Sequence, residues 1–127
     1  MRTVIIVALA VTVACCALCV VSVAYIDEAT DELSDLAMQL MDFAEAEDYG
    51  HAAETLVIMA NQWERHRPIL EMISDHEDLH TVTEHLVESQ VHLKYEHAND
   101  FYQSMALLDE SLRHIRDSER ISIANIF

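Results

Sequence analysis

The sequence predicts an all-α protein with an N-terminal transmembrane helix, followed by a four-helix exterior domain made of two helical hairpins. Three observations predict this architecture. The run Val4–Ile26 carries no charged side chain. Gly50 and Pro68 are the one glycine and the one proline of the chain, so turn signals are scarce. Beyond the run, hydrophobic residues recur at intervals of three and four, which is the period of an amphipathic helix.

The uncharged run is long enough to span a membrane. A helix of its 23 residues is about 34 Å long, and a hydrocarbon core is ~30 Å thick. The alternative is a cleaved secretory signal, because Ser22-Val23-Ala24 fits a small-x-small cleavage site, although the apolar part of such a signal usually has only about 7–15 residues. We therefore predict a transmembrane signal-anchor over residues 1–26, in contact with the lipid bilayer through residues 4–26, and an acidic extracytoplasmic domain over residues 27–127.

The charges on either side of the run predict its orientation. Arg2 is the only basic side chain before it, whereas Asp27, Glu28, Asp31 and Glu32 follow it closely. Positively charged residues favour the cytoplasmic side of a membrane. The N-terminus is therefore expected in the cytoplasm and the C-terminus outside, in a single-pass protein of the cell membrane.

Residues 27–127 are strongly acidic. They contain all 23 acidic residues and six of the seven basic ones, which gives a net charge of −17 with neutral histidines. Binding of nucleic acid requires clustered lysine and arginine, so a nucleic-acid partner is excluded. A single glycine also excludes a glycine-rich phosphate loop. Cys15, Cys16 and Cys19 all lie in the apolar run, so no disulfide is expected in the exterior domain.

The first two exterior helices are expected to separate near Gly50. No glycine or proline divides the apolar run from Asp27–Glu47, so the membrane helix is expected to continue into this segment. Asp48 is expected to cap the second helix, which reaches Arg65-His66-Arg67, and Pro68 then either ends this helix or kinks it. The expected buried stripes are Leu33, Leu36, Ala37, Leu40, Met41 and Ala44 in the first helix and Ala52, Ala53, Leu56, Met59, Ala60 and Trp63 in the second.

The third and fourth helices follow the same pattern. Ser74 and Glu77 have the spacing of a capping box, which predicts that the third helix begins at Ser74. The next break is expected near Ala98-Asn99-Asp100. The apolar tail Ile121–Phe127 is expected to pack back on the bundle or to form a contact site. The expected buried stripes are Leu79, Val82, Leu86, Ser89 and Leu93 in the third helix and Phe101, Met105, Leu108, Leu112 and Ile115 in the fourth.

An internal similarity favours two related hairpins. Ala46-Glu47-Asp48-Tyr49 and Ala98-Asn99-Asp100-Phe101 share small, aspartate and aromatic positions, each at an expected turn between helices. Two such hairpins form either a bundle or a short repeat-like stack. The period of about 34 residues found in tetratricopeptide repeats is missing, which favours the bundle.

Several features occur in a recognisable order along nearly the whole chain. They are the apolar span, the acidic first helix, Trp63 late in the second helix, Asp75-His76-Glu77 at the start of the third, and the ending Ile-Ser-Ile-Ala-Asn-Ile. This order resembles a family of small, single-pass, helical proteins of Gram-positive bacteria that is catalogued as a domain of unknown function. The resemblance implies a membrane anchor and a helical domain, and it supplies no activity and no site residues.

One motif matches a zinc-protease signature. His76-Glu77-Asp78-Leu79-His80 has the pattern H-E-x-x-H, in which two histidines on one helix face bind zinc and the glutamate activates a water molecule. Glu96, Asp100 or Glu84 would supply a third ligand. Against a protease, Glu77 is already explained as a capping residue, and a small helical domain offers no evident substrate cleft. A zinc hydrolase is therefore the third of three hypotheses for the function.

Metal binding without catalysis is the second hypothesis. A stripe of histidine and acidic residues follows the third helix at steps of four, on the side expected to face away from the core. Such a stripe can hold zinc or another divalent ion, within one molecule or between two, or it can be an ordinary solvated face whose acidic neighbours raise histidine pKa values. Its members are His76, His80, Glu84, Glu88 and His92.

The favoured hypothesis is a non-enzymatic protein-interaction module on the outer face of a membrane. No Ser-His-Asp or Cys-His arrangement is evident in residues 27–127, so we expect no catalytic residues and no cofactor. The partner is expected to be another protein or a second copy of the chain. The alternative is a metal- or pH-responsive exterior domain, in which zinc bound to the His/acid stripe is the cofactor.

Overall fold

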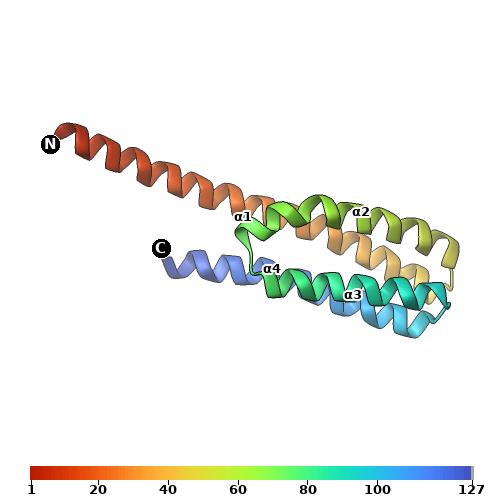
Figure 1. Cartoon of the computed structure of the whole chain (residues 1–127). Coiled ribbons are helices and arrows are strands. Elements are labelled where there is room, and N and C mark those ends of the chain that lie inside the picture. Colours follow the sequence, from red (N-terminus) through yellow and green to blue (C-terminus); the bar gives the residue numbers. More distant parts are fainter. Residues whose placement is uncertain (127) are drawn as a thin grey trace.

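The chain folds into four helices and, in the residues described, no strand (Figure 1). The computed structural model describes residues 1–126, except for the side chains at positions 122, 123 and 126. The helices are α1 (Arg2–Glu45), α2 (Tyr49–Ile73), α3 (His76–Lys94) and α4 (Ala98–Ile126). The predicted all-α class with two helical hairpins is confirmed.

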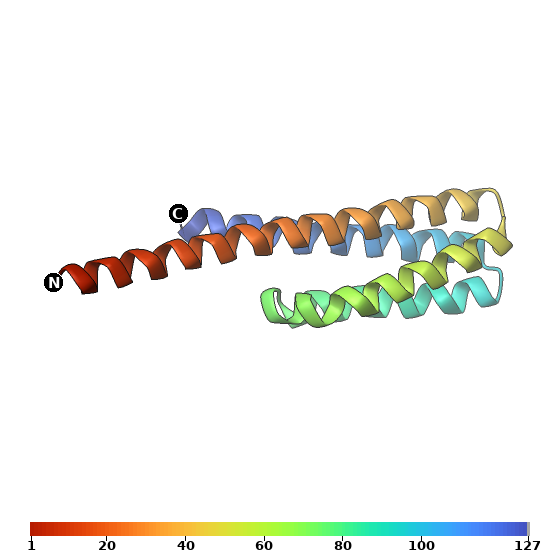
Figure 2. The same cartoon turned by 90° about the horizontal axis from the view of Figure 1, so that it is seen from above.

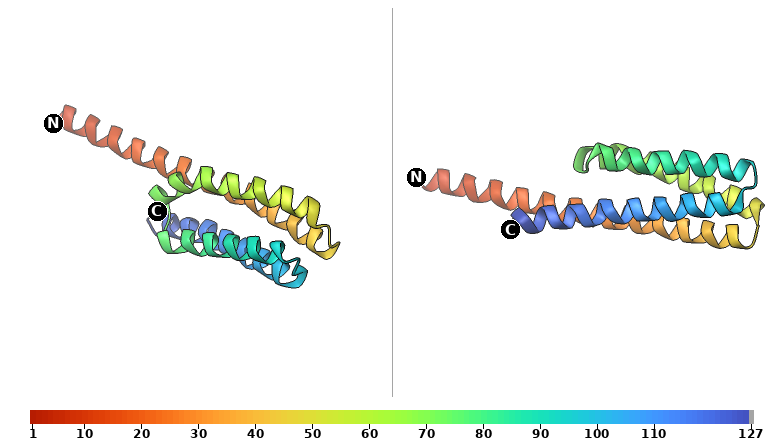
Figure 3. Two further views of the ribbon diagram at one scale, coloured as in Figure 1. Left: turned by 45° about the vertical axis from the view of Figure 1, so that its right-hand side comes forward. Right: turned by 90° about the horizontal axis from the view of Figure 1, so that it is seen from below.

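The four helices form an antiparallel bundle. They run alternately in opposite directions, with the α1–α2 and α3–α4 turns at one end and the α2–α3 turn at the other (Figures 1 and 3). Each helix packs against two others, so that α1 contacts α2 and α4, and α3 contacts the same two helices. This ring of contacts is closed, whereas a repeat-like stack would leave its first and last helices apart. The preference for a bundle is therefore confirmed.

Helix α1 belongs to the bundle only along its C-terminal half (Figure 2). Its N-terminal part has the length and apolar composition needed to cross a membrane, and no residue of its most apolar stretch is buried. From Ile26 onward one face is buried, and Ile26, Ala29 and Leu33 are each 1% exposed. As predicted, no break separates the two parts, so the boundary expected between residues 26 and 27 lies inside a continuous helix.

The predicted stripes form the core of the bundle. The indole N–H of Trp63 donates a hydrogen bond to Thr83 Oγ1 at 3.0 Å, which satisfies this polar group next to the core. Five expected members are not fully buried. Leu36, Met41, Ala60 and Leu93 are half-buried against the core, and Ala53 is exposed. Ala53, Ala60 and Leu93 line a gap between α2 and α3. The buried apolar cluster consists of Ile26, Leu33, Ala37, Leu40, Ala44, Ala52, Leu56, Met59, Trp63, Leu70, Leu79, Val82, Leu86, Phe101, Met105, Leu108, Leu112 and Ile115.

Polar contacts fix the register between α1 and α4. They join successive turns of the two helices in antiparallel order, and they lie beside the apolar core. A slide of α4 along α1 would therefore break all of them together. The contacts are the ion pairs Asp27–Arg120 at 2.8 Å and Asp31–Arg116 at 3.1 Å, and the hydrogen bond that the hydroxyl of Ser34 donates to the carboxylate of Asp109.

The N-cap of the third helix lies one residue later than predicted. Asp75, and not Ser74, caps α3, and its carboxylate accepts a hydrogen bond from the backbone N–H of Glu77 at 2.9 Å. Aspartate and serine are both good N-cap residues, and here the aspartate occupies the position while Ser74 ends α2. Helix α2 also continues through Pro68 to Ile73, so the proline does not end it.

The turn between α3 and α4 also lies earlier than predicted. It comprises residues 95–97, and Ala98–Phe101 is the first turn of α4 instead of a break. Glu96 in this turn has a φ of 55°, and Glu47 in the α1–α2 turn has a φ of 54°. Positive φ is usual for glycine and rare for glutamate, so the residue type gave no signal for the turn. The predicted similarity between Ala46–Tyr49 and Ala98–Phe101 pairs residues 52 positions apart, whereas the two positive-φ residues of the turns are 49 positions apart. The register of the predicted similarity is therefore wrong.

The apolar tail continues α4 as a helix. This helix extends beyond the α2–α3 turn and ends at Ile126 (Figure 2). Ile121, the first residue of the tail, is exposed. Phe127 lies outside the described residues, and the expected contact of the tail with the bundle or with a partner stays a prediction.

Candidate functional site

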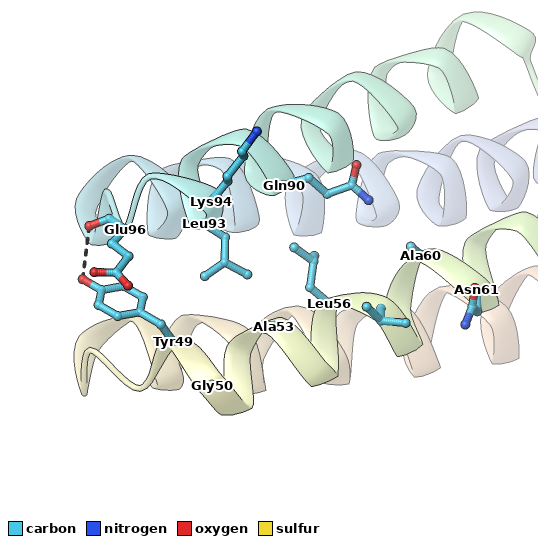
Figure 4. A pocket seen from close by; sticks show the side chains of 11 residues that line it. Tyr49, Gly50, Ala53, Leu56, Ala60, Asn61, Gln90, Leu93, Lys94 and Glu96 are labelled. Atoms are coloured by element: carbon cyan, nitrogen blue, oxygen red, sulfur yellow. Dashed lines mark hydrogen bonds between the residues drawn. The ribbon is translucent and has the colours of Figure 1, made fainter.

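A groove lies between α2 and α3, near the end of the bundle that carries the α1–α2 and α3–α4 turns (Figure 4). The contact between α2 and α3 is the least extensive of the four contacts in the ring. The groove has a volume of about 550 Å³. It is lined by Tyr49, Gly50, Ala53, Leu56, Val57, Ala60 and Asn61 from α2 and by Gln90, Leu93, Lys94 and Glu96 from α3 and the turn that follows it.

Small side chains on α2 keep the groove open. Gly50, Ala53 and Ala60 follow one another along the lining and leave room between the two helices. Leu56 and Leu93 point toward one another from the facing helices and form an apolar floor (Figure 4). The groove is therefore an apolar surface that is open to solvent.

The end of the groove next to the turns is polar. The hydroxyl of Tyr49 donates a hydrogen bond to the carbonyl oxygen of Glu96 at 3.2 Å and so joins the start of α2 to the α3–α4 turn (Figure 4). Burial raises the pKa of the Tyr49 hydroxyl, and the nearby carboxylates of Glu47 and Glu96 raise it further. The phenol therefore stays protonated at neutral pH and keeps its role as a donor.

Exposed apolar side chains border the groove. Val57 on α2 is 60% exposed. Val87 and Val91 on α3 are also exposed, and they share a helix face with Lys94 of the lining because they lie at spacings of four and three. Contiguous exposed apolar surface is typical of sites that bind a partner.

The predicted His/acid stripe lies on α3 and does not converge on one point. His80 Nε2 lies 3.1 Å from Glu84 Oε1, and Glu88 Oε2 lies 3.3 Å from Nδ1 of His85, which is not a member of the stripe. From the first member to the last the helix rises about 24 Å, so one ion cannot contact the whole stripe. Metal binding by the separate pairs stays a prediction.

The protease-like motif lies at the start of α3, where His76 and His80 are both exposed. Two of the third ligands considered, Glu96 and Asp100, lie near the other end of this helix, about 27 Å away along its axis. Glu84 lies two turns from His76. The candidate ligands of a zinc protease are thus spread along the helix and do not enclose one ion.

His92, the last member of the stripe, lies with two residues that the stripe did not include. One ligand atom from each of His92, His97 and Asp100 lies within 4.8 Å of the other two. This is the one group of three possible metal ligands in the part of the chain that the structure describes. His97 was not among the ligands predicted from the sequence, although a histidine three residues before Asp100, at an expected helix start, was a usable signal.

The groove between α2 and α3 was also not predicted from the sequence. Ala53 and Ala60 fitted the spacing of the core stripe and were assigned to the core. A usable signal was the second apolar row formed by Ala53, Val57 and Ala60, which makes the apolar face of α2 wider than one bundle contact requires.

Comparison with protein families gives a match over most of the chain. A family model described as Domain of unknown function (DUF4363) matches residues 20–126. No curated protein and no solved structure matches the chain. The match covers the whole bundle and the end of the apolar stretch, and it confirms the resemblance to a domain-of-unknown-function family that the sequence features indicated.

Proposed function

The chain belongs to the family described as Domain of unknown function (DUF4363), and we propose that it is a membrane-anchored extracytoplasmic domain that binds another protein and catalyses no reaction. The observation that carries this proposal is the open apolar groove between α2 and α3, on a bundle whose other apolar stripes are covered. Concave apolar surfaces of this kind are typical binding sites.

The anchor in this proposal is the N-terminal part of α1. Its length and apolar composition support a membrane span. Arg2 before the span and the acidic residues from Asp27 after it support a cytoplasmic N-terminus. The groove lies at the end of the bundle farthest from the apolar stretch (Figures 1 and 4). An anchored bundle therefore presents the groove away from the membrane surface.

The occupant that fits the groove is one amphipathic helix of the partner. The α2 lining extends from Tyr49 to Asn61, about 18 Å along the helix axis, which corresponds to about three turns of a helix lying beside it. Leu56 and Leu93 offer an apolar floor to such a helix, and small residues allow its close approach. Recognition of an apolar helix face by a groove is a common mode of peptide binding.

The net charge of the chain favours a basic partner over a second copy of the chain. The formal net charge of −16 repels a second copy of the chain, whereas it attracts a helix that carries basic residues beside its apolar face. We therefore propose a different protein, with a basic amphipathic helix, in preference to self-association.

Site-specific photo-cross-linking in membranes of the producing cell tests this proposal. A benzoylphenylalanine at Val57 should give one discrete cross-linked product, whereas the same probe at Gln103, which is exposed on α4, should not. Ala53→Trp fills the groove and should abolish the product from the Val57 probe. Glu54→Trp places the same side chain one residue outside the lining and should leave the product unchanged.

The identity of the product decides between partners. Mass spectrometry should find a second protein that contains an amphipathic helix with basic flanks. A product that contains only this chain would replace the proposed partner by self-association. Equal cross-linking in the Ala53→Trp and Glu54→Trp variants would show that the groove is not the binding surface. Since Ala53 and Glu54 are both exposed, circular dichroism should show the same helicity in the two variants.

A further inference from the structure

The two corners of the bundle next to the groove have the same backbone. In each, two backbone hydrogen bonds of 2.9–3.1 Å close the end of a helix, and one glutamate has a positive φ. This pattern is the Schellman motif. Equivalent residues of the two corners are 49 positions apart in the sequence, and they are Phe43 and His92, Glu47 and Glu96, Asp48 and His97, and His51 and Asp100.

The Schellman motif brings three side chains together at each corner. It bonds the N–H of the residue before the second helix to a carbonyl in the last turn of the first helix, so these two residues lie close together. The residue three positions later joins them from the first turn of the second helix. At the α1–α2 corner the ring of Phe43 stacks on His51 with centroids 5.6 Å apart, and His51 Nδ1 lies 2.6 Å from Asp48 Oδ2.

The α3–α4 corner has a histidine in place of the phenylalanine. Its three side chains are therefore all metal-ligand types, with ligand atoms within 4.8 Å of one another, and His97 Nδ1 lies 3.9 Å from Asp100 Oδ2. His92 is half-buried, whereas His97 and Asp100 are exposed. The backbone holds the three residues together, and the two exposed side chains are free to rotate toward a common point.

We propose that His92, His97 and Asp100 bind a divalent transition-metal ion, with zinc as the ion that fits the ligand set best. Two imidazole nitrogens and one carboxylate oxygen are ligands that zinc takes in proteins. In a tetrahedral site with bonds of ~2 Å, ligand atoms are roughly 3.3 Å apart. Rotation of the exposed side chains closes the remaining gap, and solvent supplies the fourth ligand.

The ion joins the last turn of α3 to the first turn of α4. Glu96, whose carbonyl oxygen accepts the hydrogen bond from Tyr49, lies between two of the ligands in the sequence. Metal binding therefore also fixes the turn whose carbonyl oxygen accepts the hydrogen bond from Tyr49 at the polar end of the groove. This site uses one member of the predicted His/acid stripe, His92, and needs none of the others.

Calorimetric titration of the full chain in detergent micelles with zinc chloride tests the site. One ion should bind per chain. His92→Ala, His97→Ala and Asp100→Asn should each weaken binding at least about tenfold, because even the loss of an outer partner of a metal ligand typically costs about 10–100-fold. Two matched histidine variants should bind as the wild type does, namely His51→Ala at the equivalent corner and His80→Ala in the stripe.

A spectroscopic readout separates coordination from a structural effect. Cobalt should give visible absorption bands of a four-coordinate ion in the wild type and in the His80→Ala variant, and these bands should be absent in the His97→Ala variant. Absence of zinc binding at ~100 μM, unchanged affinity in the His97→Ala and Asp100→Asn variants, or an equal loss in the His80→Ala variant would overturn the proposal. Circular dichroism without metal should be unchanged in the His80→Ala, His97→Ala and Asp100→Asn variants, because these three side chains are exposed.

Discussion

At the scale of single residues, two glutamates occupy a backbone conformation that favours glycine. Glu47 and Glu96 have φ values of 54° and 55°, and each follows the C-cap residue of a helix. Glycine is the usual residue at this position, because in any other residue the Cβ atom lies too close to the following carbonyl oxygen, which costs roughly 1–2 kcal/mol. Both side chains are exposed. The two corners therefore store strain that residue type alone would not reveal.

Glu47→Gly should stabilise the bundle by about 0.5–1 kcal/mol. The substitution removes the strain at positive φ, and part of that gain is offset by the larger conformational freedom of glycine in the unfolded chain. Thermal unfolding of the full chain in detergent, followed by circular dichroism, measures the change. Gln39→Gly, at an exposed position with ordinary helical backbone in α1, should instead destabilise by about 1 kcal/mol. A loss of stability in both variants would contradict the strain at Glu47.

Glu119 is an acidic residue whose charge opposes folding. Burial raises the pKa of its carboxyl above the ordinary 4.5, and the carboxylate of Asp78 raises it further. A carboxyl with a raised pKa in the folded state binds protons more tightly there than in the unfolded chain, so stability rises as the pH falls through the folded pKa.

Glu119→Gln should therefore raise the melting temperature at neutral pH, and this advantage should shrink as the pH falls through the folded pKa of the wild-type carboxyl. Melting curves of both proteins from pH 7 down to about pH 4 check the prediction. Glu110→Gln, an exposed acid on the same helix, controls for the general loss of one negative charge. A gain in Glu119→Gln that is no larger than in Glu110→Gln, or that persists unchanged in acid, would contradict it.

At the scale of the helices, the buried face of α3 can be tested with neighbouring residues. Leu86 is 6% exposed and Val87 is 52% exposed. Leu86→Asp should cost several kcal/mol, because an unpaired carboxylate in the core must be desolvated or protonated. Val87→Asp should change the stability by no more than about 0.5 kcal/mol. Thermal unfolding of the two variants compares them, and a small effect of Leu86→Asp would show that another face is buried.

The helix faces could be predicted from the sequence, and so could the cap of α2 at Asp48, whose carboxylate accepts a hydrogen bond from the backbone N–H of His51. The starts of α3 and α4 could not. Residues such as Leu79, Val82 and Leu86 lie on one stripe because spacing alone sets the face of a helix, and packing then buries that stripe. The ends depend on a competition between neighbouring residues that suit the same capping position. Ser74 and Asp75 are both suitable caps, and only the local backbone decides between them. Glu96 adopts positive φ without the glycine that normally marks such a turn.

At the scale of the whole molecule, both candidate sites depend on relations between helices. The groove exists because α2 and α3 contact each other less extensively than the other pairs, and a pattern read along one helix does not contain the distance to its neighbour. His92 was visible as a candidate ligand, whereas its proximity to His97 and Asp100 follows from the path of the chain through a turn. Sequence patterns therefore predict the residue types of a site better than their grouping.

The orientation of the whole chain can be tested by chemical labelling of an introduced cysteine. Cys15, Cys16 and Cys19 all lie in the apolar part of α1, so a cysteine introduced elsewhere has a distinct environment. Gln103→Cys on α4 should react with a membrane-impermeant maleimide in intact cells, because the proposed topology places the bundle outside. Thr3→Cys, on the other side of the span, should react only after permeabilisation.

The same labelling separates an anchor from a cleaved signal. If the span is retained, the labelled Gln103→Cys protein should stay in the membrane fraction at full length. A labelled soluble chain that begins at Tyr25 would establish cleavage, and labelling of Thr3→Cys in intact cells would reverse the orientation. Arg2 lies just before the span, whereas the first lysine or arginine after it is Arg65, so a reversed orientation would also contradict the positive-inside bias.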